Sequence, residues 1–328
     1  MNAPLSPARI GTLPADADPA FLHDVLRGLA MPQKVVPARW LYDRRGAELF
    51  ELITHLPEYY PTRTERALLA SHAAAMAHHI GPHHTVIEFG AGSASKTPLL
   101  LAAIRPAAYV PVDISGEFLH ASARQLAALF PELPVHPVVG DFTRPLQLPM
   151  LDDAPRLGFF PGSTIGNLVA PAAVDLLRSM AATLGPAAKL LIGFDRLKPA
   201  ALLLPAYDDA QGVTAAFNLN LLQRINRELD GTLPVTAFRH QAIWNETETR
   251  IEMHLEAMRE LAFTVAGQRF HMRAGETLHT ENSIKYGPRD MRLLLQAGGW
   301  SPLQEWSDDA QLFSVVLAQA SGSGTMQA

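Results

Sequence analysis

The stretch Thr85-Val86-Ile87-Glu88-Phe89-Gly90-Ala91-Gly92-Ser93-Ala94-Ser95-Lys96 decides how this chain folds. It contains a short apolar strand, a turn with two glycines and the start of a helix. Glycine carries no Cβ and tolerates positive φ, so Gly90 and Gly92 let the backbone approach a ligand closely. A Gly-x-Gly turn by itself is a weak signal, and its neighbours must identify the ligand.

Carboxylates accompany this turn and the two strand-like runs that follow it. Glu88 lies two residues before Gly90, Asp113 ends the second apolar run, and Asp141 follows the third. The N-terminal end of a helix favours a phosphate, which a carboxylate beside it would repel. A ligand with an amino group, a ribose and an adenine suits carboxylates at all three places. The pattern therefore favours S-adenosylmethionine (SAM) over a nicotinamide dinucleotide.

Each acid near the turn has an expected contact with SAM. Glu88 would accept from the ammonium group, and Asp113 would meet the ribose hydroxyls, as second-strand acids do in nucleotide folds. Asp141 would bind the adenine amino group while Phe142 flanks the ring. Lys96 would pair with the methionine carboxylate or cap the following helix. Taken singly, each residue fits a solvated charge at a strand end equally well.

Strand-like and helical runs alternate between residues 85 and 195. The strands are apolar throughout, which predicts a parallel sheet covered on both faces, with the ligand at the carboxyl ends of the strands. A capping-box pattern at Thr62-Arg63-Thr64-Glu65 predicts an earlier helix to about His79. The predicted strands are 86–89, 109–112, 135–139, 157–160 and 190–194, and the predicted helices are 96–104, 117–130 and 172–184.

The alternation breaks after Asp195. A helix at 213–228 precedes strand-like runs at 236–244, 250–257 and 263–271, and the chain closes with a helix at 288–297 and strands at 303–306 and 312–318. The fold class is therefore α/β, a class I SAM-dependent methyltransferase (Rossmann-like) sheet with an inserted α+β substrate-binding domain. We predict a flexible N-terminus at 1–20, a substrate-binding domain at 21–60 and 196–286, a SAM-binding domain at 61–195 and 287–320, and a flexible tail at 321–328.

The composition excludes several classes of protein. Hydrophobic residues make up 48% of the 328 residues and charged residues 18%, which is typical of a globular chain. The net charge of −5 argues against a nucleic-acid partner, since phosphates need a basic surface. The absence of cysteine excludes disulfides, thiolate metal sites and a cysteine nucleophile. Adjacent histidines at 78–79 and 83–84 lack the spacing of a zinc site, so no metal is predicted.

The chain also lacks targeting and membrane signals. Residues 1–20 have no basic segment followed by an apolar one, so they do not resemble a signal peptide. No run of about 18 apolar residues is present to span a membrane. We expect a cytoplasmic monomer that acts on a small-molecule substrate.

Three further segments carry polar residues whose role the pattern alone leaves open. They are Leu56–Arg63 with its paired tyrosines, Gly162–Leu168 with Asn167, and Thr280–Tyr286 with Glu281. Asn167 fits a helix cap as well as a ligand contact, Glu281 fits a surface ion pair, and the tyrosines fit simple packing. Methylases of nucleobase amino groups carry an Asn/Asp-Pro-Pro-aromatic motif at the second of these places, and it is missing here.

These segments closely resemble the histidine-specific Nα-methyltransferases of ergothioneine biosynthesis. The resemblance runs from about residue 20 to 320 and implies a SAM-dependent enzyme that trimethylates the α-amino group of free L-histidine, through the mono- and dimethyl forms, to hercynine. The matching stretches are Trp40-Leu41-Tyr42-Asp43, Leu56–Arg63, Gly162–Leu168, Ala206-Tyr207-Asp208-Asp209-Ala210, Gly212–Asn218, Arg250-Ile251-Glu252-Met253 and Thr280–Lys285.

The resemblance also implies the site residues. Glu281 and Ser283 would hold the imidazole, with Met253 packed near the ring. Asn167 and Tyr207 would hold the amino-acid end and act as the catalytic pair. The full expected histidine set is Tyr42, Tyr59, Asn167, Tyr207, Met253, Glu281 and Ser283, and the SAM set is Glu88, Gly90, Gly92, Lys96, Asp113, Asp141 and Phe142. Ala91, where some members have Ser, and Pro161 before Gly162 depart from the family pattern.

The amine must lose a proton before it attacks the methyl group, and no dedicated base is evident. Tyr42, a bound water or deprotonation in solvent are all open.

A relative acting on a tryptophan derivative and a non-catalytic SAM-binding protein stay as alternatives. An indole offers one donor and no acceptor, so Glu281 with Ser283 weighs against the first. Glu88 beside the glycine turn weighs against an NAD-dependent oxidoreductase.

Overall fold

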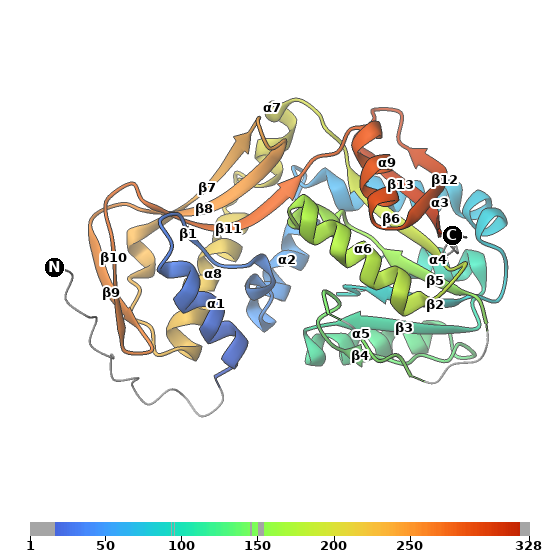
Figure 1. The fold of residues 1–328 in the computed structure, drawn as a ribbon, viewed down its shortest axis with the longest axis horizontal. Helices are drawn as coiled ribbons and strands as arrows, with labels where there is room; N and C mark the ends of the chain where they lie inside the picture. The colour runs from blue at the N-terminus through green and yellow to red at the C-terminus, as the bar shows by residue number, and fades with distance from the viewer. Residues whose placement is uncertain (1–16, 93, 95, 145, 150–153, 322–328) are drawn as a thin grey trace, which may run out of the picture. The chain divides into compact units, whose positions relative to one another are not determined.

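A computed structural model describes residues 17–92, 94, 96–144, 146–149 and 154–321. The chain divides into two compact units, each described here by itself (Figure 1). The larger unit comprises residues 54–202, 246–250 and 283–328, and the smaller comprises 1–53, 203–245 and 251–282. Most of the two predicted flexible ends lies outside the described residues. Helix α1 (Pro19–Leu29) begins inside residues 1–20, the segment predicted as a flexible N-terminus.

The larger unit is built on a seven-stranded sheet with the order β12-β13-β6-β5-β2-β3-β4. Strands β2, β3, β4, β5 and β6 pair in parallel, whereas β13 pairs antiparallel with both β6 and β12. The predicted parallel sheet with an antiparallel end is confirmed. The strands are β2 (Thr85–Phe89), β3 (Ala108–Asp113), β4 (Val138–Val139), β5 (Arg156–Phe160), β6 (Lys189–Asp195), β12 (Trp300–Ser307) and β13 (Phe313–Ala320).

Helices cover both faces of this sheet (Figure 1). Successive side chains of a strand point to opposite faces, so neighbouring residues belong to different hydrophobic cores. Ile87 belongs to the core that includes residues of α6 and α9, and Val86 belongs to the core that includes residues of α3, α4 and α5. Strands buried on both faces explain why their sequences are apolar throughout. The helices that cover the sheet are α3 (Tyr60–Ile80), α4 (Thr97–Ile104), α5 (Gly116–Leu129), α6 (Ala170–Leu184) and α9 (Pro288–Ala297). The short helix α7 (Ala200–Leu203) follows β6 and contributes to neither core.

The smaller unit contains a four-stranded sheet, a two-stranded hairpin and helices. The sheet order is β1-β11-β8-β7, and β1 pairs in parallel with β11 through Lys34 and Leu278. Its elements include β1 (Lys34–Val35), α2 (Arg44–Thr54), α8 (Val213–Glu228), β7 (Phe238–Asn245), β8 (Arg250–Ala257), β9 (Leu261–Val265), β10 (Gln268–Met272) and β11 (Thr277–Ile284), with 3₁₀ turns η1 (Ala38–Leu41), η3 (Leu204–Ala206) and η4 (Val235–Ala237). The helix predicted at 213–228 and the strand predicted at 250–257 are confirmed.

The capping box predicted at Thr62 is wrong. Helix α3 begins at Tyr60 with Tyr59 as its N-cap, so Thr62 is buried inside the first turn. Pro61 sets this earlier start, because a proline is favoured where a helix N–H has no partner. Glu65, the expected partner of Thr62, instead binds groups from other elements.

Two strand predictions also need correction, and one strand was missed. The single strand predicted at 263–271 is the antiparallel hairpin β9–β10, because Ala266 and Gly267 both have positive φ, 49° and 76°, and turn the chain. The strand predicted at 135–139 shrinks to β4 with one bridge from Val135, since Pro137 cannot donate to the ladder. The eight-residue strand β11 was not predicted at all.

Strand β11 has an uneven burial pattern that explains why it was missed. Leu278 and Thr280 are buried, but the next buried residues are Ser283 and Lys285, so the alternation slips by one position at 281–282. A strict period of two is the sequence signal of a strand, and this slip breaks it.

The 3₁₀ turn η2 (Thr164–Asn167) packs directly on the backbone at the end of β11. A Cβ placed on Gly166 would lie 2.9 Å from the Ile284 carbonyl oxygen and 3.2 Å from its nitrogen. Such distances require the two segments to separate, so Gly166 permits the close approach.

Replacing Gly166 with alanine should therefore lower the free energy of unfolding by about 1–3 kcal/mol, the usual scale for overpacking a tight site. Urea unfolding followed by circular dichroism measures this. Val169→Ala is the control, because Val169 follows the same turn and is 45% exposed. Equal stabilities of Gly166→Ala and the wild type would contradict the close packing.

Candidate active site

The glycine turn is tied to the neighbouring strand β3. The N–H groups of Gly90 and Ala91 both donate to the Val112 carbonyl, at 2.9 and 3.0 Å. The Gly92 N–H donates to Asp113 Oδ2 at 3.0 Å. Gly90 and Gly92 have φ of 75° and 51°, which favours glycine at both positions. The turn is thus fixed at the carboxyl ends of β2 and β3, where a ligand of a parallel sheet is expected.

Asp113 occupies the position predicted for the ribose contact. Besides Gly92, it accepts from the Ser115 N–H at 2.9 Å through Oδ1. Burial raises the pKa of its carboxyl group, and the backbone hydrogen bonds oppose that rise. Each carboxylate oxygen has two lone pairs, so the same group is able to accept from ligand hydroxyls as well.

Phe142 lies against the glycine turn. A Cβ on Gly90 would be 3.3 Å from Phe142 Cε1, a tight contact that the ring would have to move slightly to accept. The loop that carries Phe142 is anchored to β3 by the Gly140 N–H, which donates to the Asp113 carbonyl at 3.0 Å. Asp141 accepts from the Thr143 N–H at 3.0 Å and forms a local turn. The structure thus brings Gly90, Asp113 and Phe142 together, as the cofactor prediction requires.

Glu88 lies beneath the turn rather than at its surface. Its side chain is buried, and Oε2 accepts from the hydroxyls of Tyr109 at 2.6 Å and Thr97 at 2.7 Å. Burial raises the pKa of Glu88 to about 7, against the effect of these two hydrogen bonds. The structure therefore shows Glu88 joining β2, β3 and α4, and its contact with the cofactor ammonium stays a prediction.

Lys96 forms an ion pair with Glu65 of α3, and its side chain is 13% exposed. Glu65 also accepts from the Gly162 N–H, at 3.1 and 3.0 Å from its two oxygens, so this pair connects α3 to the end of β5. Lys96 is the N-cap residue of α4 but makes no capping bond with its side chain. The alternative that it caps the helix is wrong, because an ammonium group only donates and helix N-termini need acceptors.

A buried cluster around Asp195, at the end of β6, was not foreseen. The carboxylate accepts from the Tyr60 hydroxyl at 2.8 Å, from Lys198 at 2.5 Å and from Lys285 at 2.7 Å. Lys285 also donates to Ser283 Oγ at 2.7 Å. Burial lowers the pKa of Lys198 to about 8, although Asp195 opposes the shift. The strand-end reasoning that selected Asp113 and Asp141 applies equally to Asp195 and could have found it.

Three residues of the predicted histidine set lie beside this cluster in the larger unit. Tyr59 directly precedes Tyr60, and Ser283 is hydrogen-bonded through Lys285. The Asp195 N–H donates to Ser163 Oγ at 2.8 Å, and Ser163 is the N-cap of the turn that ends at Asn167. The structure therefore gathers the segments of Tyr59, Asn167 and Ser283 around one carboxylate.

The other predicted histidine contacts lie in the smaller unit. Tyr42 packs edge-on against Phe50 and Phe217, with ring centroids 5.5 and 5.4 Å away. Tyr207 is buried, and its carbonyl accepts from His240 Nε2 at 2.8 Å. Met253 is buried in β8. Glu281 lies in β11 and is partly buried. The roles of these residues in binding histidine stay predictions.

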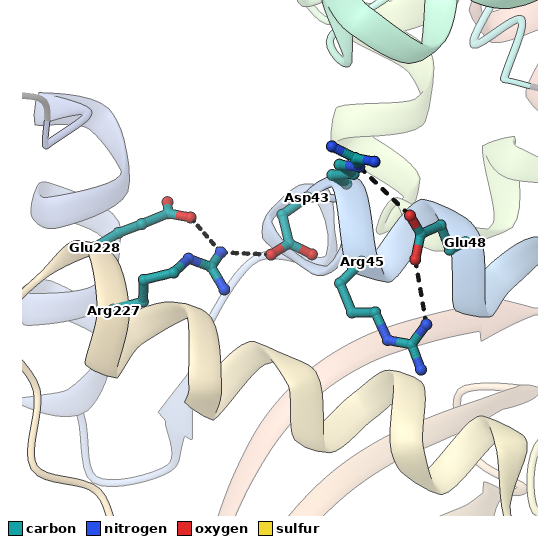
Figure 2. A pocket seen from close by; sticks show the side chains of 6 residues that line it. Asp43, Arg45, Glu48, Arg227 and Glu228 are labelled. Atoms are coloured by element: carbon teal, nitrogen blue, oxygen red, sulfur yellow. Dashed lines mark hydrogen bonds and ion pairs between the residues drawn. The ribbon is translucent and has the colours of Figure 1, made fainter.

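A surface pocket next to Tyr42 is lined by opposite charges in equal number (Figure 2). Arg227 bridges Asp43 and Glu228, with both contacts at 2.6 Å. Asp43 also accepts from the Gly46 N–H at 2.7 Å, which fixes the first turn of α2. The balanced charges favour a structural role, namely fixing the segment that carries Tyr42. The lining residues are Asp43, Arg44, Arg45, Glu48, Arg227 and Glu228.

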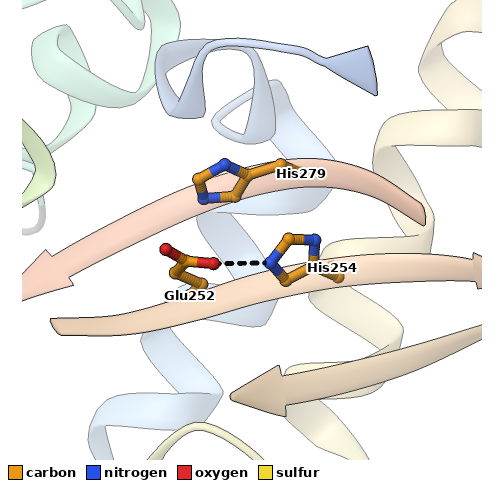
Figure 3. A group of neighbouring side chains, drawn as sticks. All are labelled: Glu252, His254 and His279. Carbon is orange, nitrogen blue, oxygen red and sulfur yellow. Dashed lines mark hydrogen bonds and ion pairs between the residues drawn. The ribbon is translucent and has the colours of Figure 1, made fainter. Parts of the chain in front are cut away.

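Glu252, His254 and His279 form a second polar group in the smaller unit (Figure 3). Their donor atoms lie within 4.8 Å of one another, and the three are residue types that bind metals. However, the two imidazoles are stacked, with centroids 4.6 Å apart and planes 17° from parallel, so their in-plane lone pairs do not converge on one point. His254 Nε2 lies 3.0 Å from Glu252 Oε2, a hydrogen-bond distance. The geometry favours a hydrogen-bonded stack over a metal centre.

Fold and turn together define the class of this protein. The parallel strands, the antiparallel strand β13 inserted beside β6, and the acid-flanked glycine turn are those of a class I, Rossmann-like SAM-dependent methyltransferase.

Comparison with known proteins defines the class further. Residues 21–320 match the family model described as "Histidine-specific methyltransferase, SAM-dependent". The chain is 40% identical to a histidine N-alpha-methyltransferase of Mycolicibacterium smegmatis, covering 91% of this chain and 94% of that one. The corresponding protein of Mycobacterium tuberculosis is 39% identical, with the same coverage. Ergothioneine biosynthesis protein 1 of Neurospora crassa is 29% identical over 83% of this chain and 32% of its own length. The chain belongs to the histidine-specific, SAM-dependent methyltransferase family.

Among the helices that the structure describes, none has the length and apolar character needed to cross a membrane.

Replacing Asp113 with alanine should weaken SAM binding by about 1.5–3 kcal/mol, the scale of hydrogen bonds to a charged group. Titration calorimetry with SAM measures the change. Asp175→Ala serves as the control, because Asp175 is a highly exposed acid on α6. An unaltered SAM affinity in Asp113→Ala would place this carboxylate outside the cofactor site.

Glu88 should make stability depend on pH. Its pKa is about 7 in the folded protein against 4.5 in the unfolded chain, so the folded state binds more protons between these values. The stabilisation is complete below pH 4.5 and is lost as the pH rises to 7, a change of roughly 3 kcal/mol. Glu88→Gln should remove this part of the pH profile in urea unfolding. Parallel profiles for both proteins between pH 4.5 and 7.5 would contradict the raised pKa.

Proposed function

We propose that this chain transfers three methyl groups in succession from SAM to the α-amino nitrogen of free L-histidine. The products are the mono- and dimethyl forms and finally hercynine. Formation of hercynine is the first step of ergothioneine biosynthesis. The observation that carries the proposal is the match to a histidine-specific family over residues 21–320, on a fold whose glycine turn has the acids expected for SAM.

The proposed cofactor contacts lie on the larger unit. Gly90 and Gly92 admit the methionine end of SAM, Asp113 accepts from the ribose hydroxyls, and Phe142 covers the adenine. Asp141 binds the adenine amino group. Glu88 accepts from the ammonium group and Lys96 pairs with the carboxylate of the methionine end, and both also fix the turn through their contacts with protein groups.

The proposed substrate contacts divide by chemistry. A carboxylate and a hydroxyl, Glu281 and Ser283, suit the two nitrogens of an imidazole. Asn167 and Tyr207 suit the charged amino-acid end, and they act as catalytic residues by holding the amine in line with the methyl group. Tyr59, Tyr42 and Met253 complete the set with aromatic and apolar surface.

Alignment supplies most of the rate enhancement in this proposal. A neutral amine displaces the sulfonium in line, so no group has to stabilise an oxyanion. Correct orientation of two reactants is worth on the order of 7–11 kcal/mol. The amine proton leaves by one of three routes: to Tyr42, to a bound water, or to solvent before binding. The Asp195 carboxylate is unsuited to that task, because Tyr60, Lys198 and Lys285 all donate to it.

The domain assignment made from the sequence, the cytoplasmic location and the monomeric state belong to the same proposal. They are supported by composition and by the family resemblance, and each stays a prediction.

Incubating the purified protein with SAM and each of the 20 amino acids tests the activity. Mass spectrometry should find the trimethylated betaine with histidine alone, at three SAM consumed for each histidine. Methylation of an imidazole nitrogen would contradict the roles given to Asn167 and Tyr207. Preferential methylation of tryptophan would instead establish the indole alternative.

Glu281→Ala should reduce kcat/KM for histidine by about 10²-fold or more, since it removes a charge-assisted bond worth about 3 kcal/mol. SAM affinity should change by less than twofold. Glu281→Gln is the matched control: it keeps an acceptor without the charge, so its loss should be smaller. Normal histidine kinetics in Glu281→Ala would contradict ring recognition by Glu281 and favour the structural alternative, an ion pair.

A further inference from the structure

Tyr207 lies in an irregular segment of the smaller unit, between the 3₁₀ turn η3 and helix α8. Its N–H donates to the Leu204 carbonyl at 3.0 Å, which closes the turn. Farther along, Asp209 accepts from the N–H groups of Val213 and Thr214 at 3.0 and 2.7 Å and fixes the start of the helix. The Tyr207 carbonyl lies outside any regular helix or strand, and a buried carbonyl is costly unless it accepts a hydrogen bond.

His240, on β7, donates that hydrogen bond and contacts a second group through its other ring nitrogen. Nε2 lies 2.8 Å from the Tyr207 carbonyl oxygen, and Nδ1 lies 2.9 Å from the side-chain nitrogen of Asn218 on α8. The same amide nitrogen lies 3.2 Å from the carbonyl oxygen of His254 on β8. One imidazole ring and one amide therefore connect Tyr207 to a helix and two strands of the smaller unit.

The direction of each hydrogen bond follows from groups that have one role only. A backbone carbonyl only accepts, so the Asn218 amide nitrogen must face His254, and the flipped amide is excluded. That nitrogen only donates, so His240 Nδ1 accepts and carries no proton. The Tyr207 carbonyl also only accepts, so His240 Nε2 carries the proton. Both neighbours therefore require the same neutral tautomer of His240.

The electrostatic surroundings favour this neutral ring. Burial lowers the pKa of His240, and His254 acts in the same direction. The backbone hydrogen bond and the nearby Asp208 and Asp209 oppose this shift without reversing it. A protonated ring would turn an Nδ1 hydrogen against the hydrogens of the Asn218 amide. The neutral ring satisfies both neighbours and avoids the cost of a buried charge.

We propose that His240, held as the Nε2-protonated tautomer by Asn218, is a positioning residue that fixes the backbone at Tyr207. This role rests on the proposed function, in which Tyr207 holds the amino-acid end of histidine. A displacement of about 1 Å is enough to misalign a reacting group, so the backbone that carries Tyr207 has to be held firmly. His240 acts on histidine binding through Tyr207 and needs no contact of its own with the substrate.

Histidine binding in the presence of S-adenosylhomocysteine, measured by calorimetry, tests this role. His240→Phe keeps a ring and removes both polar contacts, so the Kd for histidine should rise about tenfold, while the Kd for S-adenosylhomocysteine changes less than about twofold. His240→Gln returns a donor toward the carbonyl, so its Kd for histidine should rise less than about threefold. Unchanged histidine affinity in His240→Phe, or equal losses in the two variants, would overturn the proposal.

Asn226→Ala is the matched control for the loss of hydrogen bonds inside the smaller unit. Asn226 donates to the Leu233 carbonyl and accepts from the Leu233 N–H, both at 2.8 Å. This variant should lose stability and keep its histidine affinity within about twofold of the wild type. A loss of histidine affinity equal to that of His240→Phe would overturn the specific role of His240.

A double-mutant cycle with Tyr207→Phe separates this role from the proposed function. Tyr207→Phe removes the hydroxyl and should itself raise the Kd for histidine about tenfold or more. Because His240 acts through Tyr207, His240→Phe should add less than about threefold in the Tyr207→Phe background. Fully additive losses would overturn the role of His240 and leave that of Tyr207 intact. Normal histidine affinity in Tyr207→Phe would instead refute the proposed role of Tyr207, and that of His240 with it.

The tautomer is measurable on the wild type alone, which keeps the test independent of how the variants fold. In protein labelled with ¹⁵N-histidine at pH 7, the ring of His240, assigned through its own backbone resonances, should show an unprotonated Nδ1 and a protonated Nε2. A proton on Nδ1, in the neutral ring or in an imidazolium, would overturn the proposal.

Discussion

The buried carboxylate of Asp195 holds together the segments of Tyr59, Asn167 and Ser283 in the larger unit, which we propose to bind the substrate. Its side chain is 1% exposed, and it joins the start of α3 through Tyr60 and the end of β11 through Lys285. The Asp195 N–H donates to Ser163, the N-cap of the turn that ends at Asn167. Removing one member of a buried ion pair typically costs 3–5 kcal/mol. The positions of these segments are therefore coupled, because they share one partner.

The cofactor side is built differently. There most of the hydrogen bonds are made by the backbone. The N–H groups of Gly90 and Ala91 donate to the end of β3, and Asp113 accepts from the N–H groups of Gly92 and Ser115. The main side-chain contribution comes from the buried Glu88, which joins β2 to β3 and α4 through its hydrogen bonds. A site made from strand ends and backbone suits a cofactor that many enzymes share. In our proposal, substrate selection rests on side chains instead.

The sequence predicted a parallel sheet with an antiparallel end and the glycine turn, because periodicity and glycine positions are local signals. It missed one feature with a local signal and two that depend on tertiary contacts. Pro61 moved the start of α3 and turned Glu65 toward Lys96 and Gly162. The slip in the burial of β11 hid a strand. The pairing of Asp195 with Lys285 joins residues 90 positions apart, which no local pattern reveals.

We propose that Asp195 holds the segments that bind histidine and leaves the binding of SAM unaffected. Calorimetry on Asp195→Asn, a variant of nearly equal shape, tests it most directly by measuring histidine and SAM binding separately. Histidine affinity should fall by about tenfold or more, because an amide leaves the two lysines without their counter-charge, while SAM affinity should change less than twofold. Unchanged histidine affinity, or an equal loss for both ligands, would contradict it.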